Sequence, residues 1–311
     1  MILNVGTRGS KLSLIQTDLV LKNLKKIFPD LKFNIKIIET TGDIELKKPI
    51  FSINQRGIFE KEIDQLLVHG ELDFAVHSLK DVPIFEEQSE IVLAAVPKRD
   101  SPLEALVSID KIPLKMLPKS AIIGTSSLRR MIQIKYLRPD LEVRPIRGNV
   151  DTRVQKVKHG EVHGVVLSLA GLERLGLEEF VTEVFPPEIL TPPAGQGALA
   201  VVARKDRTDV IEILKTIDHP TTRAEVTAER SLISAIQGGC HFPIGAYACT
   251  KGDKLFLYGC ILSIDGMNKV EASAEASIHE ARDLGRRVAS MLLSRGAEEI
   301  RATWREKYGI W

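Results

Sequence analysis

Three observations predict an α/β protein with more than one domain. Short apolar runs alternate with stretches of helix length through about the first two hundred residues, the pattern of a doubly wound sheet. The same rhythm restarts after the polar, turn-prone residues 97–102, which predicts a second α/β domain. From about His219 the order changes to a helix, alternating strands and closing helices. We therefore predict a smaller α+β C-terminal domain with a three-stranded antiparallel sheet.

The first domain begins with a strand and a long amphipathic helix. Leu12, Ile15 and Leu19 recur on one helical face, and Ser10 stands where an N-cap is expected. A second helical pattern ends at Gly70, a residue suited to a left-handed C-cap. We predict strands at residues 2–6, 33–39 and 73–77 and helices at 11–27 and 58–70, followed by a further β-α repeat.

The later elements follow the same logic. A Pro-rich stretch, residues 185–193, ends the second domain, and residues 198–203 then predict a buried strand that returns to the first domain. We predict domain 1 at residues 1–98 with 198–217, domain 2 at 99–197 and domain 3 at 218–311. The expected elements are strands at 121–125, 142–146, 244–250, 254–263 and 269–277 and helices from about 128 and at 222–236.

Composition limits the classes of protein that the chain can represent. With 311 residues, 44% apolar and 27% charged, it resembles an ordinary globular protein, and a net charge of +2 argues against binding to nucleic acid through a general basic field. We see no secretory signal, and no apolar run approaches the about 20 residues of a membrane span. We therefore expect a soluble, cytoplasmic protein. Three cysteines without C-x-x-C spacing indicate neither a disulfide framework nor a zinc site.

Several familiar motifs are absent. The sequence contains no G-x-x-x-x-G-K-[ST] loop, and Gly195-Gln196-Gly197 is too short for a dinucleotide fingerprint. His159 and His163 have i,i+4 spacing, but Gly160 between them indicates a helix end rather than a metal-binding face. We expect no metal site.

Residues 124–130, Gly-Thr-Ser-Ser-Leu-Arg-Arg, are the most informative segment. A predicted strand passes through a hydroxyl-rich turn into a helix, where helix N–H groups, hydroxyls and the guanidiniums of Arg129 and Arg130 would suit a phosphate or carboxylate. On these residues alone a Ser N-cap with two surface arginines stays an open alternative. Arg144, Arg147 and Arg153 follow closely and indicate a second anion site on the same edge.

Arg8-Gly9-Ser10 follows the first strand of domain 1, the equivalent edge of that sheet. Ligands of doubly wound sheets bind beyond the carboxyl ends of the strands. Arginines from two domains directed to one cleft therefore predict a ligand with several carboxylates, because each charge-assisted contact contributes about 1.5 to 3 kcal/mol.

Two further residues are candidates for chemistry. Asp81, in His77-Ser78-Leu79-Lys80-Asp81-Val82-Pro83, is a candidate acid, base or cation stabiliser, with a turn aspartate before Pro83 as the open alternative. Cys240 stands between Gly238-Gly239 and His241-Phe242-Pro243, a loop position from which a thiol can react or carry an attached group. Burial is the commoner fate of a cysteine, and we expect it for Cys249 and Cys260.

Six segments taken together resemble the porphobilinogen deaminase family, also called hydroxymethylbilane synthases. They span most of the chain: residues 7–10, 76–83, 124–130, 147–153, 195–198 and 238–245. The resemblance implies three domains, the first two doubly wound and like periplasmic binding proteins, and the third carrying the attachment cysteine on a loop.

The resemblance also implies an activity. Family members are transferases of tetrapyrrole and heme biosynthesis: four porphobilinogens are condensed head to tail, ammonia leaves, and water releases linear hydroxymethylbilane. Their dipyrromethane cofactor, made from the substrate, is held by a thioether to the cysteine that Cys240 matches. Asp81 matches the catalytic carboxylate, which contacts pyrrole N–H groups, assists loss of the amine and stabilises the azafulvene cation.

Other positions match binding residues of the family. For the cofactor these are Ser78, Lys80, Asp81, Thr125, Ser126, Ser127, Arg129, Arg130, Arg147 and Gly148, and for the substrate Arg8, Ser10, Gln16, Arg147, Arg153, Arg174 and Gln196. The mobile first-domain loop, often Gly-Gly-Lys-Gly, reads Asn-Gln-Arg-Gly at residues 54–57, so Arg56 replaces a lysine. Gly-Ser-Lys at residues 9–11 likewise replaces a more usual Gln-Ser-Pro.

A second hypothesis is a binding module without chemistry, since two α/β lobes around an anion cleft also describe solute-binding proteins. The lack of a secretion signal and the Cys-bearing third domain weigh against it. We expect a monomer whose partner is the small molecule porphobilinogen, with no nucleic acid or membrane partner.

Overall fold

The computed structural model describes residues 1–40, 60–83, 89–236 and 243–308. These residues form two compact units. As far as they are described, the first comprises residues 1–40, 60–83, 89–100 and 197–223, and the second comprises residues 101–196, 224–236 and 243–308. The division into three domains with the predicted limits stays a prediction.

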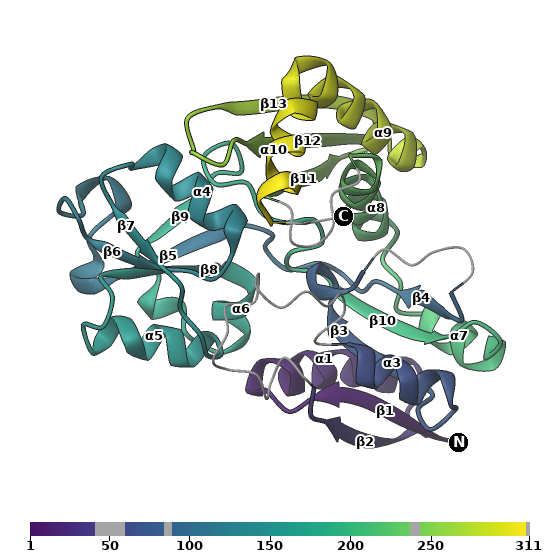
Figure 1. Cartoon of the computed structure of the whole chain (residues 1–311). Coiled ribbons are helices and arrows are strands. Elements are labelled where there is room, and N and C mark those ends of the chain that lie inside the picture. The colour runs from purple at the N-terminus through teal and green to yellow at the C-terminus, as the bar shows by residue number, and fades with distance from the viewer. Residues whose placement is uncertain (41–59, 84–88, 237–242, 309–311) are drawn as a thin grey trace. The chain divides into compact units, whose positions relative to one another are not determined.

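The first unit is built on a five-stranded sheet in the order β2-β1-β3-β10-β4 (Figure 1). Its strands are β1 (Ile2–Arg8), β2 (Lys32–Ile38), β3 (Phe74–Ser78), β4 (Ile91–Ala95) and β10 (Leu199–Arg204). The first three are parallel, whereas β10 runs antiparallel to both β3 and β4. The late strand therefore joins the first sheet, as the sequence predicts.

Helices cover both faces of this sheet. They are α1 (Lys11–Ile27), α3 (Lys61–Val68) and α7 (Thr208–Lys215). Val5 belongs to a core shared with α1 and α7, whereas a Cβ on Gly6 would lie 3.2 Å from Ile63 of α3. Because neighbouring strand residues point to opposite faces, α1 and α3 lie on opposite sides of the sheet. Ser10 caps α1 as expected, accepting a hydrogen bond from the Ser13 N–H.

The second unit contains a sheet of the same design, in the order β7-β6-β8-β5-β9. Its strands are β5 (Glu104–Ser108), β6 (Ile122–Gly124), β7 (Glu142–Arg144), β8 (Gly164–Ser168) and β9 (Glu183–Phe185). β6, β7 and β8 correspond to β1, β2 and β3, and β5 takes the antiparallel place that β10 has in the first sheet. Each sheet is thus mixed rather than purely parallel.

Neighbouring residues of these strands again point to opposite faces of the sheet, and helices cover both faces. The helices are α4 (Leu128–Leu137), α5 (Val150–Lys158) and α6 (Leu169–Arg174). Leu106 and Val166 share one core with Ile134 of α4, while Val107 and Val165 share another with α5 and α6. The predicted doubly wound architecture is confirmed.

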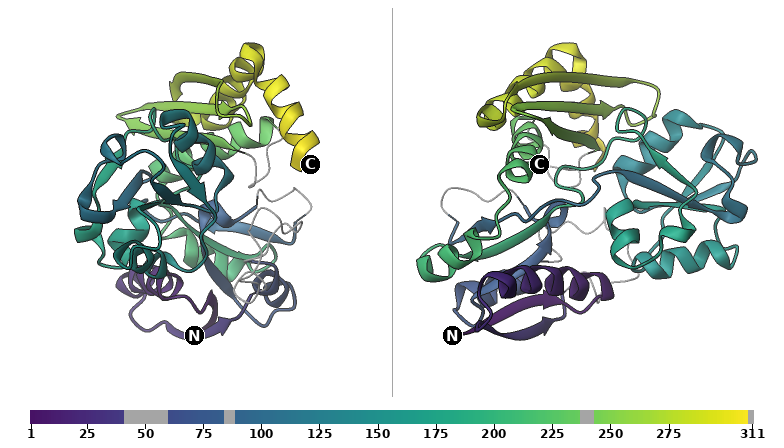
Figure 2. Two further views of the ribbon diagram at one scale, coloured as in Figure 1. Left: turned by 60° about the vertical axis from the view of Figure 1, so that its left-hand side comes forward. Right: turned by 180° about the vertical axis from the view of Figure 1, so that it is seen from behind.

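A three-stranded antiparallel sheet, also predicted, completes the second unit (Figures 1 and 2). It consists of β11 (Ile244–Lys251), β12 (Lys254–Leu262) and β13 (Lys269–Ser277), with helices α8 (Pro220–Ala235), α9 (Ala281–Leu292) and α10 (Glu298–Tyr308). Trp304 of α10 is fully buried in their common core and donates its Nε1–H to the Leu262 carbonyl at 2.9 Å.

The described residues also form single turns: 3₁₀ turns at Leu79–Asp81, Ile109–Lys111, Leu114–Met116, Glu178–Phe180 and Ile278–Glu280, and a π turn at Leu293–Ala297. None of the helices in the described part of the chain has both the length and the apolar character needed to span a membrane.

The base of α4 is fixed to the C-terminal sheet. Leu128 and Ile132 of α4 lie in the same core as α8 and β12. The buried Glu229 carboxylate of α8 accepts hydrogen bonds from the N–H groups of Gly195, at 2.7 Å, and Ala248, at 2.9 Å. The helix that carries Arg129 and Arg130 therefore packs against α8 and the C-terminal sheet.

Gly285 allows α9 to approach α8 closely. A Cβ there would lie 2.5 Å from the Ala228 carbonyl oxygen and 2.5 Å from the Ser231 Cβ. Alanine stabilises an isolated helix by about 1 kcal/mol relative to glycine. Here the added Cβ would clash with the backbone of α8, and the cost of this clash outweighs the gain. We expect Gly285→Ala to lower the free energy of unfolding by about 1 to 3 kcal/mol in urea titrations. Ser290→Ala, at an exposed position of the same helix, is the control and should change it by less than about 0.5 kcal/mol.

Candidate functional site

Many of the predicted site residues lie at equivalent edges of the two five-stranded sheets. In the first unit β1 ends at Arg8, and Asp81 follows β3 by three residues. In the second, residues 125–127 follow β6, the counterpart of β1, and residues 145–149 follow β7. These are the carboxyl ends of parallel strands, where α/β proteins bind ligands.

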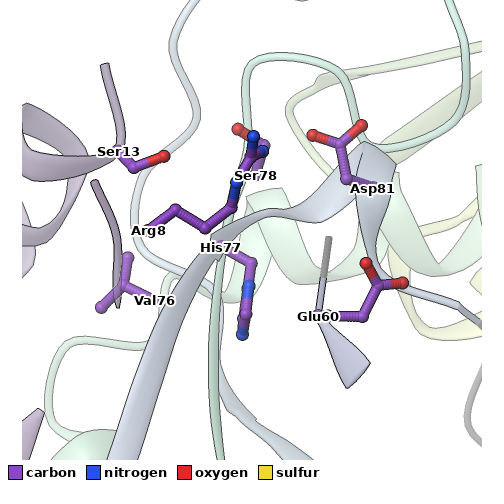
Figure 3. A pocket seen from close by; sticks show the side chains of 7 residues that line it. All are labelled: Arg8, Ser13, Glu60, Val76, His77, Ser78 and Asp81. Atoms are coloured by element: carbon purple, nitrogen blue, oxygen red, sulfur yellow. The ribbon is translucent and has the colours of Figure 1, made fainter. Parts of the chain in front are cut away.

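A pocket in the first unit brings several of these residues together (Figure 3). Arg8 and Ser78 line it with Asp81, whose side chain is exposed at the end of the 3₁₀ turn that follows β3. Sequence analysis assigned roles to these three residues. The lining also includes Ser13, Glu60, Val76 and His77.

The polar residues around this pocket hold one another in place. Gln16 of α1, which is 4% exposed, donates its Nε2–H to the Ser78 hydroxyl at 2.9 Å, and the hydroxyl lies 3.2 Å from Oε1 of the same amide. The Ser10 and Ser13 hydroxyls are 2.8 Å apart. Lys80 is half-buried in the turn that carries Asp81. The structure thus links Ser10, Gln16 and Ser78 to the pocket, as structural as well as candidate binding groups.

His77 adds a group to which the sequence motif gave no role. Its ring is 7% exposed, and its Nε2 has no hydrogen-bond partner within the described residues. Burial, and secondarily the nearby guanidinium of Arg8, lower the pKa of His77 from 6.5 to about 4. The imidazole is therefore neutral at neutral pH.

The hydroxyl-rich turn of the second unit has its own internal bonds. Ser127 caps α4 by accepting from the Arg130 N–H, and Thr125 Oγ1 accepts from the Ser127 N–H at 3.2 Å. The Ser126 hydroxyl donates to the Ile146 carbonyl and accepts from the Ile146 N–H at 3.1 Å. This last pair ties the turn after β6 to the turn after β7, so the two predicted anion-binding segments lie together.

Arg129 and Arg130 converge on a buried internal carboxylate, that of Glu104. Arg129 Nη2 lies 2.5 Å from Oε1, and Arg130 binds both oxygens through Nε and Nη2 at 2.7 to 3.1 Å. All three side chains are less than 10% exposed. Burial lowers the pKa of Arg129, Glu104 works against this lowering, and Arg130 adds to it. The open alternative of two surface arginines is wrong.

Glu104 reaches this place because β5 is antiparallel. As the first residue of β5 it pairs with Ser168, the last residue of β8, at the carboxyl edge of the parallel strands. Gln196, fully buried, completes the cluster by donating to the Pro102 carbonyl at 2.8 Å and accepting from Arg130 at 3.5 Å.

Further guanidiniums surround this pair. Arg153 donates its Nε–H to the Gly148 carbonyl at 2.8 Å. Burial, then Arg130 and then Arg147, lower the pKa of Arg153 from 12.5 to about 10. Gly148 has φ of +112°, which favours glycine, and a Cβ there would lie 2.7 Å from Thr152. We call Arg129, Arg130, Arg147 and Arg153 the arginine cluster, and Glu104 binds the first two of them.

Some predicted residues stand elsewhere or outside the described residues. Arg144 is exposed and paired with Glu142 at 2.5 Å. Arg174 ends α6, and its role stays a prediction. Cys240 and Arg56 lie outside the described residues. Cys260 is buried as expected and donates to Thr191 Oγ1 at 3.0 Å, whereas Cys249 is only half-buried.

His159 and His163, which have i,i+4 spacing, lie at and beyond the end of a helix. α5 ends at Lys158, His159 is its C-cap, and His163 Nδ1 accepts a hydrogen bond from the Ile122 N–H at 3.0 Å. Within the described part of the chain, no group of three or more His, Cys, Asp or Glu side chains is placed to hold a metal ion.

Sequence reasoning missed Glu104 and the part that His77 and Glu60 play in the pocket. The only signal for Glu104 was a charged residue directly before the apolar run 105–107. That signal is weak, since charged residues often precede strands. The direction of β5, which places the carboxylate at the site, is a tertiary property.

Together, these features define an α/β protein with a cluster of arginines at the edge of one sheet and an acid-bearing pocket at the equivalent edge of the other. Residues 3–212 match the model of the porphobilinogen deaminase dipyromethane cofactor binding domain, and residues 223–294 match the porphobilinogen deaminase C-terminal domain. The chain belongs to the porphobilinogen deaminase family. It is 43% identical over 307 residues to the probable porphobilinogen deaminase of Nitrosopumilus maritimus, covering 99% of this chain and 98% of that one. It is 44% identical over 298 residues to the porphobilinogen deaminase of Desulforudis audaxviator, covering 96% of each.

Solved structures were also matched. The BvgS VFT2 domain of Bordetella pertussis has a TM-score of 0.42 and 14% identity, over 70% of this chain and 86% of that chain. A probable amino-acid ABC transporter extracellular-binding protein of Bacillus subtilis has a TM-score of 0.41 and 13% identity, over 70% and 90%. TM-scores this low do not establish a common fold, and membership of the family rests on the sequence matches.

Removing the charge of Glu104 should destabilise the protein strongly. In Glu104→Gln two buried guanidiniums lose their carboxylate, and breaking a buried ion pair from one side costs about 3 to 5 kcal/mol. We expect a loss of this size in urea unfolding. Glu142→Gln, which removes the carboxylate from the exposed pair with Arg144, is the control and should leave the unfolding curve unchanged. Equal stability of both variants would show that Glu104 does not hold the cluster.

Proposed function

We propose that this chain is a hydroxymethylbilane synthase that condenses four porphobilinogens head to tail with loss of ammonia and releases hydroxymethylbilane with water. The observation that carries the proposal is the arginine cluster, in a chain whose cofactor-binding and C-terminal domains both match the family. Porphobilinogen bears acetate and propionate groups, which are the ligands that such a cluster suits.

The charge of the cluster supports a ligand with several carboxylates. Arg130, Arg147 and Arg153 are close enough for their like charges to lower the pKa of Arg153. Such proximity is unfavourable unless anions compensate it, and Glu104 is bound by Arg129 and Arg130. Carboxylates of a ligand would bind here through charge-assisted, often bidentate hydrogen bonds.

The same residues fit a dipyrromethane cofactor, which is built from two substrate units and carries their carboxylates. We propose that Arg129, Arg130, Arg147 and Gly148, with the hydroxyls of residues 125–127, hold it, and that Cys240 is its point of attachment. When bound, the cofactor supplies the carbon to which the first substrate unit is joined. We also propose Ser78, Lys80 and Asp81 as cofactor-binding residues, and as substrate-binding residues Arg8, Ser10, Gln16, Arg147, Arg153, Arg174 and Gln196.

Asp81 is the proposed catalytic residue. The turn that carries it is fixed by two backbone hydrogen bonds, from the Leu79 N–H to the Ala198 carbonyl at 3.0 Å and from the Val82 N–H to the Leu79 carbonyl at 3.1 Å. Its exposed carboxylate can accept hydrogen bonds from pyrrole N–H groups and stabilise the positive charge that develops on the ring as the amine leaves.

The remaining expectations are a cytoplasmic location and a monomeric state. A reducing compartment is supported by Cys249 and Cys260, which are both free thiols. The monomeric state rests on the resemblance alone, and sedimentation equilibrium tests it.

The attachment of a cofactor to Cys240 can be measured by intact mass. We expect the purified protein to exceed its sequence mass by two substrate-derived pyrrole units, and we expect Cys240→Ser to lack this increment. Cys249→Ser is the matched control and should retain it. An unmodified wild-type chain, even after incubation with porphobilinogen, would favour a binding module that performs no chemistry.

Replacing the proposed catalytic carboxylate should abolish turnover without unfolding the protein. In cofactor-loaded Asp81→Asn, the amide can no longer compensate positive charge, and we expect hydroxymethylbilane formation to fall by at least about 100-fold. Asp18→Asn, an exposed position on α1, is the control and should keep full activity. Normal turnover by loaded Asp81→Asn would refute the role of Asp81.

A further inference from the structure

A buried amide on α4 holds a segment that is far away in the sequence. Gln133 is 2% exposed and stands one helical turn after Arg129, on the same face of α4. Its amide forms two hydrogen bonds with the backbone of Thr191, in the Pro-rich stretch 185–193. Oε1 accepts from the Thr191 N–H at 2.6 Å, and Nε2 donates to the Thr191 carbonyl at 3.0 Å. We call this pair the Gln133–Thr191 clamp.

The carbonyl that the clamp holds is also an acceptor for Arg129. Arg129 Nη1 donates to the Thr191 carbonyl at 2.5 Å, while Nη2 binds Glu104. Acceptors on two different nitrogens fix the plane of a guanidinium, whereas a single acceptor would let it pivot. These bonds occupy two of its five N–H groups, and the described residues provide no further acceptor for the others. Arg129 is thus oriented from within the protein and keeps donors for a ligand.

Thr191 is also fixed by the C-terminal sheet. A Cβ on Gly245 of β11 would lie 2.6 Å from Thr191 Cγ2 and 3.1 Å from the Thr191 carbonyl oxygen, so the strand approaches this residue closely. The Cys260 thiol of β12 donates to Thr191 Oγ1 at 3.0 Å. Thr191 therefore joins the helix that carries Arg129 to the sheet whose first strand begins shortly after Cys240.

This inference rests on the proposed function, in which Arg129 binds a carboxylate of the cofactor and Cys240 holds the cofactor at another point. A tethered ligand gains from a guanidinium only when that group is held in the matching position. We propose that Gln133 is a positioning residue of the cofactor site, because its clamp fixes the carbonyl that orients the Arg129 guanidinium. Gln133 acts through Arg129 rather than on the ligand.

A packing role is the alternative. In that role the amide satisfies two buried backbone groups and nothing more, and its loss destabilises the protein equally with and without the cofactor. In the positioning role, its loss also weakens the contact between Arg129 and the cofactor. The two roles therefore differ in how much stability the attached cofactor adds.

The stabilisation by the cofactor is measured as a difference between two urea midpoints, that of the loaded chain, identified by its intact mass, and that of Cys240→Ser. Gln133→Met keeps the length of the side chain but removes both hydrogen bonds. We expect it to shrink this difference by about a quarter to a half, because one of the proposed cofactor-binding arginines loses its orientation. Ser108→Ala, which removes buried hydrogen bonds at the other end of β5, is the control. It should lower both midpoints and leave their difference unchanged.

Two further variants complete the test. Gln133→Asn is one carbon too short to reach Thr191, and it gives the same comparison if Gln133→Met does not fold. In an Arg129→Lys background, Gln133→Met should reduce the difference no further, because Gln133 acts through Arg129.

An undiminished difference in Gln133→Met, with both midpoints lowered equally, would overturn the proposal in favour of a packing role. An equal reduction of the difference in the wild-type and Arg129→Lys backgrounds would overturn it as well, because Gln133 would then act by another route. A wild-type chain that gains no mass increment from porphobilinogen would refute the proposed function, and this inference with it.

Discussion

The arrangement of the arginine cluster depends on one buried carboxylate. Glu104 binds Arg129 and Arg130 at the same time and thereby fixes two guanidiniums that would otherwise repel each other. The positions of these two guanidiniums are therefore set from within the protein, as the preorganisation of a binding site requires.

Glu104 reaches Arg129 and Arg130 because of a topological feature that both five-stranded sheets share. Each contains one antiparallel strand, β10 in the first and β5 in the second, inserted beside parallel strands. The first residues of these strands lie at the edge where the parallel strands end. Glu104 starts β5 there, and Ala198, just before β10, holds the turn of Asp81. The same architectural element supports an arginine cluster in one unit and a carboxylate in the other.

Most of the fold was predictable from local patterns. Helix α1 and strand β13 have the predicted bounds, and the strands of the C-terminal sheet begin where alternation begins. Patterns of period two and 3.6 report burial on one face, which is a local consequence of the final structure. The direction of β5 was not predictable, because the short apolar run at residues 105–107 gives the same pattern in a parallel and in an antiparallel strand.

For the candidate site, the sequence by itself determined the residue types and the turns that hold them: arginines after β1, β6 and β7, and an aspartate after β3. Its motifs also determined the family. Only the tertiary structure decided that Arg129 and Arg130 share Glu104, that Ser126 joins two turns, and that His77 is buried. These properties depend on contacts between segments separated by 20 or more residues, and such contacts leave no local pattern in one sequence.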